Sequence, residues 1–133
     1  MTERVARMQR VTRLLPAERA EIDARRVRSL VRDMGQPSAE RLFGRALDEI
    51  EERVRRADEA AGGGDFRRAA KAVRQLVPIA DAVGLTGISR VAAMASGAAE
   101  SGDGAALAAL LARLGRAIHG SVRAIGEAWA ARL

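Results

Sequence analysis

Residues 64–84 constrain the fold of this chain more than any other stretch. Asp65 follows a run of glycines and can accept hydrogen bonds from the first free N–H groups of a helix. Apolar side chains then recur at alternating spacings of three and four: Phe66, Ala69, Val73, Leu76, Ala80 and Val83. This spacing places them on one side of an α-helix, which must be buried against other helices.

A second row of side chains borders this apolar stripe and is too polar to belong to a core. It consists of Arg67, Lys71, Arg74, Pro78 and Asp81. Such a row is where a helical bundle can present a reactive or docking side chain. Pro78 lacks an N–H group and its ring displaces the carbonyl of Arg74, so we expect the helix to kink there.

The rest of the chain also predicts helices. Aromatic residues make up only 2% of the 133 residues, so Ala, Leu, Val and Ile must build the core, and Ala is the strongest helix former. We expect helices over 3–15, from Pro16 or Asp23 to Met34, over 38–61, over 66–83, from a Thr86 cap to Ser101, and from an Asp103 cap through Trp129. The short connections between them indicate antiparallel neighbours.

The predicted fold is therefore all-α, an antiparallel four-helix bundle from about residue 38 to 126 with additional N-terminal helices packed across it. The apolar series Phe43, Leu47, Ile50, Val54, Ala57 and Ala61 is expected to face the 66–83 stripe. Met34 is expected to face inward with Ile22, Val27, Leu30 and Val31. Residues 1–21 form an N-terminal amphipathic extension with a basic face, and residues 22–133 form the bundle.

Composition narrows the classes of function. The net charge of +6 favours acidic partners, and the absence of cysteine removes disulfides and thiolate sites. No spacing supports a metal site, and no cofactor is expected. We also expect no membrane helix and no secretory signal, and therefore a cytoplasmic protein.

The organising stretch resembles the central helix of the histidine-containing phosphotransfer (HPt) domains of bacterial phosphorelays. Gly64-Asp65 opens the family pattern, Leu76 fills its Leu position and Gly84 closes it. Residues 22–35, 84–91 and the second Gly-Asp at 102–103 are similar to the family's other helices, so the resemblance covers roughly residues 22–126. It implies an HPt-like four-helix bundle that works with a response-regulator receiver domain or a histidine kinase.

The chemical motif of that family is changed in this chain. Arg74 occupies the position of the phospho-accepting histidine, Val77 that of a lysine and Pro78 that of a glycine. A guanidinium has five donors and no acceptor, so it cannot take up a phosphoryl group. We therefore expect a non-enzymatic binding protein whose partner-binding residues are Lys71, Arg74, Gln75, Val77 and Pro78, with Arg74 paired to carboxylates. The competing interpretation is that Arg74 is merely a solvated side chain in a domain that lost its activity.

Three other functions remain open at this stage. His119 flanks the last apolar seam and is the one alternative phosphoacceptor, although no Lys-Gly signature follows it. An arginine-rich nucleic-acid binder is disfavoured, because the basic residues are scattered and few aromatics are available for stacking. A purely structural helical module, a homodimer through its N-terminal helices, is the last alternative.

Overall fold

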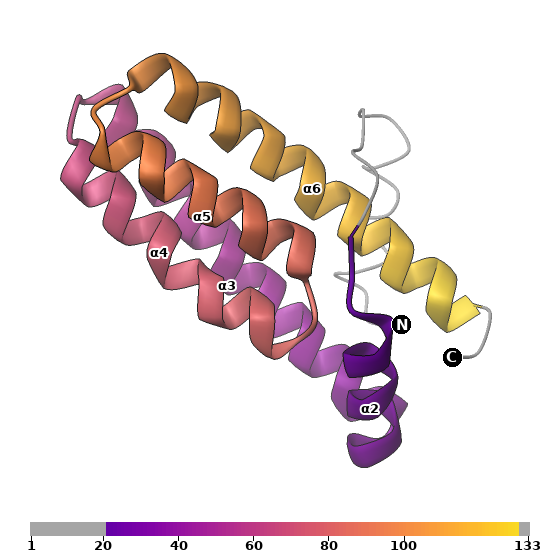
Figure 1. The fold of residues 1–133 in the computed structure, drawn as a ribbon. Helices are drawn as coiled ribbons and strands as arrows, with labels where there is room; N and C mark the ends of the chain where they lie inside the picture. The colour runs from indigo at the N-terminus through magenta and orange to yellow at the C-terminus, as the bar shows by residue number, and fades with distance from the viewer. Residues whose placement is uncertain (1–20, 131–133) are drawn as a thin grey trace.

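The computed structural model describes residues 21–130, and within that range the chain is helical apart from short turns (Figure 1). Its helices are α2 (Ala24–Met34), α3 (Gln36–Gly62), α4 (Phe66–Ala82), α5 (Thr86–Glu100) and α6 (Gly104–Ala130). The all-α prediction is confirmed for this range, which contains no strand. The helix predicted over 3–15, and with it the suggested dimer contact, lies outside the described residues.

Helices α3 to α6 lie side by side around one core (Figure 1). Helix α4 packs against both α3 and α5, and α6 packs against α5 and more lightly against α3. Helices α4 and α6 therefore occupy opposite corners of the group. Helix α2 packs on α3 at one end of it.

The three turns between these long helices share one construction. A glycine with positive φ stands in each turn, namely Gly64, Gly84 and Gly102. The next N–H then donates to a carbonyl near the end of the preceding helix, as from Leu85 to Ala80 at 2.9 Å. These bonds satisfy carbonyls that the end of a helix would otherwise leave unpaired.

Two of the predicted helix caps are correct and one is wrong. Asp65 accepts from the N–H of Arg68 at 3.1 Å, and Asp103 accepts from the N–H of Ala106 at 3.0 Å. Thr86 is not a cap: α5 already begins there, and the N-cap is Leu85, which is buried and makes no side-chain capping bond. Packing of Leu85 into the core thus decides where α5 starts.

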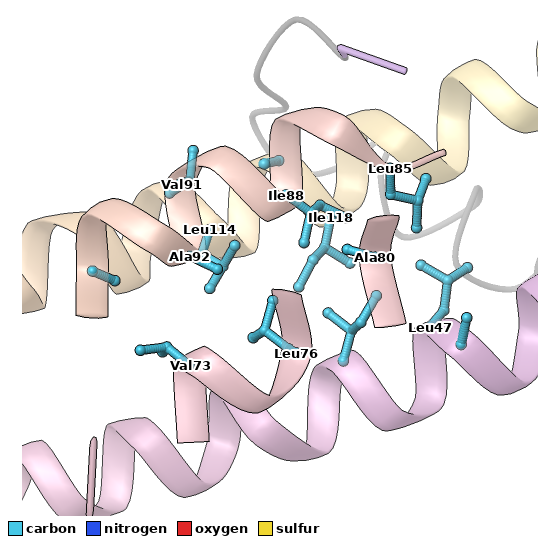
Figure 2. Packing of buried hydrophobic residues seen from close by; sticks show 14 of the residues in the cluster. Leu47, Val73, Leu76, Ala80, Leu85, Ile88, Val91, Ala92, Leu114 and Ile118 are labelled. Carbon is cyan, nitrogen blue, oxygen red and sulfur yellow. The ribbon is translucent and has the colours of Figure 1, made fainter. Parts of the chain in front are cut away.

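The predicted stripes of α3 and α4 are buried against each other. Ile50 and Val73 are both fully buried, and Leu47, Leu76 and Ala80 lie in the same cluster (Figure 2). Leu114 and Ile118 of α6 reach this cluster from the other side (Figure 2).

One expectation about local structure needs correction. Met34 was expected to face inward but is 41% exposed, because it is the last residue of α2, and that short helix buries only Val27 and Leu30. Helix α4 runs through the exposed Pro78 to Ala82, and the kink expected at Pro78 stays a prediction.

The segment that precedes α2 crosses the turn between α4 and α5. The N–H of Asp23 donates to the carbonyl of Gly84 at 2.8 Å, and the N–H of Gly87 donates to the carbonyl of Glu21 at 3.0 Å. Arg90 also forms an ion pair with Glu21, and this hydrogen bond lowers the pKa of the Glu21 carboxyl. Residues 21–23 therefore tie the N-terminal side of the described chain to the start of α5.

This crossing depends on glycine. A β-carbon on Gly84 would lie 3.1 Å from the carbonyl oxygen of Asp23, and φ at Gly84 is +78°. A β-carbon on Gly87 would lie 3.1 Å from the β-carbon of Glu21 and 3.2 Å from its carbonyl oxygen. Only a residue without a side chain lets the two backbones approach so closely.

Two glycines of α5 provide a matched test of this contact. We predict that Gly87→Ala lowers the free energy of unfolding by about 1 kcal/mol or more, since the added methyl group forces residues 21–23 away. Gly97→Ala, where nothing lies within 4 Å of the added β-carbon, should instead raise it by about 0.5–1 kcal/mol. Urea denaturation of both variants measures the difference. Equal stabilisation by both substitutions would contradict the close crossing.

Candidate functional site: the outer face of helix α4

Helix α4 buries a large part of its circumference and leaves a narrow polar face. Its buried residues are Ala69, Ala70, Ala72, Val73, Leu76 and Ala80. Four of the five predicted docking residues, Lys71, Arg74, Gln75 and Pro78, are exposed and share one side of the helix. Val77 differs, because it is half-buried and packs against the core cluster.

Arg74 is engaged by a residue that the sequence pattern did not indicate. Its Nη1 lies 2.6 Å from Oε1 of Glu100, at the end of α5. Both side chains are 55% exposed, and the hydroxyl of Ser96 donates weakly to the same carboxylate oxygen at 3.4 Å. The guanidinium is thus drawn toward α5, although solvent still reaches it.

An open groove of about 520 Å³ lies between α4 and α5 beside this ion pair. Arg67 and Arg74 line it together with Glu100, and Phe66 and Ala70 provide apolar wall. The groove therefore combines two guanidinium groups, one carboxylate and a modest apolar surface.

Lys71 and Gln75 line a different groove, between α4 and α3. It has a volume of about 210 Å³, and its other lining residues are Arg56, Arg68 and Ala72. The predicted row is consequently divided, with Arg74 directed to the α5 side and Lys71 and Gln75 to the α3 side. Arg56 and Arg68 belong to this site and were missed by the sequence reasoning.

His119 lies away from the α4 face. It is half-buried on α6, between the buried Ile118 and Gly120, and α6 occupies the corner opposite α4. The structure therefore does not bring the histidine together with Lys71, Arg74 or Gln75.

Two other kinds of site receive no support from the described range. Among residues 21–130, no three His, Asp or Glu side chains converge as metal ligands would. None of the helices described here combines the length and the apolar character required to span a bilayer.

Comparisons with known proteins assign no family to this chain. No family model, no curated protein and no solved structure matches it.

The exposure of the Arg74–Glu100 pair predicts a weak contribution to stability. In a double-mutant cycle with Arg74→Gln and Glu100→Gln, we expect a coupling free energy below about 1 kcal/mol, as is usual for exposed ion pairs. Arg67→Gln, which removes a charge from the same groove, is the control for nonspecific charge effects. A coupling above about 2 kcal/mol would show that Arg74 is instead a structural residue of the α4–α5 interface.

Proposed function

We propose that this chain is an HPt-like binding module that docks a receiver domain or a histidine kinase through α4 without carrying a phosphoryl group. The observation that supports it most is the state of Arg74. The residue at the position of the family's phospho-accepting histidine is an exposed arginine, and its ion pair with Glu100 is itself half in solvent. The proposal also implies a cytoplasmic location, where such partners work.

The chemistry of the α4 face favours binding over phosphotransfer. A phosphoryl acceptor needs a nitrogen lone pair, which the Arg74 guanidinium lacks. Val77 and Pro78 supply neither the charge nor the small volume of the lysine and glycine in the family pattern. His119, the chain's one histidine, is half-buried on a helix at the opposite corner.

Arg74 can change partners at small cost. Because an exposed ion pair contributes at most about 1 kcal/mol, carboxylates on a docking protein can replace Glu100 as the partner of Arg74. An arginine can hold a carboxylate through two parallel hydrogen bonds, which adds orientation to the attraction. The resemblance implies such a partner, since receiver domains carry an acidic pocket around their phospho-accepting aspartate.

The test is a titration of purified receiver domains from the source organism against the wild type, Arg74→Ala and Arg74→Glu at low and physiological salt. We expect a receiver domain to bind the wild type, with affinity falling as salt rises. Arg74→Glu should weaken binding more than Arg74→Ala, because it adds repulsion to the lost contact. The fold should survive both changes, since Arg74 is not part of the core.

Arg123→Glu is the matched control. Arg123 is an exposed arginine of α6, and its ion pair with Glu127 at 3.1 Å resembles that of Arg74. Arg123→Glu changes the net charge by the same amount as Arg74→Glu. It should leave the affinity for the receiver domain near the wild-type value. Equal affinities for all variants would contradict docking at Arg74. Acid-labile phosphate on the protein that His119→Ala abolishes would show that the chain is an active phosphotransfer protein.

A further inference from the structure

The groove between α3 and α4 gathers positive charge from two helices. Arg56 reaches it from α3, and Arg68, Lys71 and Gln75 reach it from α4 around Ala72. Residues 68, 71, 72 and 75 follow the helical spacing that puts side chains on one face. Within residues 21–130, no carboxylate lines this groove.

Two of the three cationic side chains of this groove, Arg68 and Lys71, are not neutralised within the described chain. The Nε of Arg56 lies 3.2 Å from Oε1 of Glu52, but Glu52 also binds Arg55, and that hydrogen bond lowers the pKa of the Glu52 carboxyl. Arg55 also lies 3.3 Å from Oε1 of Glu59, so Glu52 and Glu59 together balance the charges of Arg55 and Arg56. Neither Arg68 nor Lys71 has an ion-pair partner within residues 21–130. The groove is thus a concave surface with a net positive charge, and its Arg68 and Lys71 donors face solvent.

We propose that this groove binds the carboxylate side chains of an acidic segment on a partner protein. Carboxylates match the guanidinium, ammonium and amide donors that converge here, and the 210 Å³ volume suits one or two side-chain ends. The inference rests on the proposed function for the kind of partner, and it adds a second contact point beside Arg74. The docking face then spans both sides of α4.

Two features favour a protein over a nucleic acid in this groove. No aromatic side chain lines it, so a base would find no ring to stack on. Glu52 and Glu59 lie on the same side of α3 as Arg56 by their spacing, so the positive charge does not continue along that helix as a phosphate chain would require.

The test uses a blocked hexaglutamate peptide as the probe and the full ¹⁵N-labelled chain as the protein. Titration at low salt should shift the amide signals of residues 68–75, whereas blocked hexaglutamine should not. Arg68→Gln and Lys71→Gln should each weaken binding about three-fold, the usual scale for one exposed charge contact. Arg123→Gln is the matched control, since it removes an exposed charge from α6 and lines neither groove. It should leave the affinity unchanged.

Three results would overturn the assignment. They are equal weakening by the Arg123 and Arg68 variants, shifts centred on the α4–α5 groove, and saturable binding of inorganic phosphate or a single-stranded oligonucleotide at lower concentration than the peptide. The proposed function fails separately, if hexaglutamate fills the groove but no receiver domain binds the chain. If a receiver domain binds the Arg68 and Lys71 variants as tightly as the wild type, the α3–α4 groove is not part of the docking face, and docking through Arg74 is unaffected.

Discussion

The packing of α4 between α3 and α5 is the constraint on which the rest of the structure depends. Small residues make it achievable, because Ala69, Ala70 and Ala72 let two neighbouring helices approach α4 from two sides. Val73 and Leu76 fill the space that remains toward α6. The strip that α4 leaves to solvent borders two grooves that belong to different helix pairs.

The turn between α4 and α5 sets the relative position of these two helices. Gly84 makes the turn, Leu85 is buried beneath it, and residues 21–23 hold it from outside through two backbone hydrogen bonds. With the start of α5 fixed in this way, the end of α5 brings Glu100 beside Arg74. The direct packing of α4 on α5 along their length carries that position from the turn to the Arg74–Glu100 pair.

Helical periodicity was enough to predict the helices and their buried sides. The stripe of α4, the burial of Ile50 and Val73, and the caps at Asp65 and Asp103 all follow from spacing and capping chemistry within one helix. The errors at Thr86 and Met34 have one origin. At Thr86 the burial of the neighbouring Leu85 accompanies the start of α5, and at Met34 no other segment of the described range covers the end of α2. The periodicity of a single helix does not show which other segments pack against it.

The candidate site was only half predictable for the same reason. Periodicity shows that Lys71, Arg74 and Gln75 are exposed on one face, but it does not show which residues of α3 and α5 lie beside them. Glu100 is 26 residues from Arg74, and Arg56 comes from the preceding helix, so neither is visible in a local pattern. The register between neighbouring helices places Arg74 in a groove with Glu100 of α5, and Lys71 and Gln75 in a groove with Arg56 of α3.

In the proposed function, α4 is the surface through which this chain meets a receiver domain or a kinase. Hydrogen–deuterium exchange of the chain with and without a bound receiver domain can locate that surface. We expect added protection in peptides from residues 66–82 and from the adjoining part of α3, with peptides of α6 around His119 unchanged. Protection centred on His119, or a complex that leaves 66–82 unaltered, would contradict docking through α4.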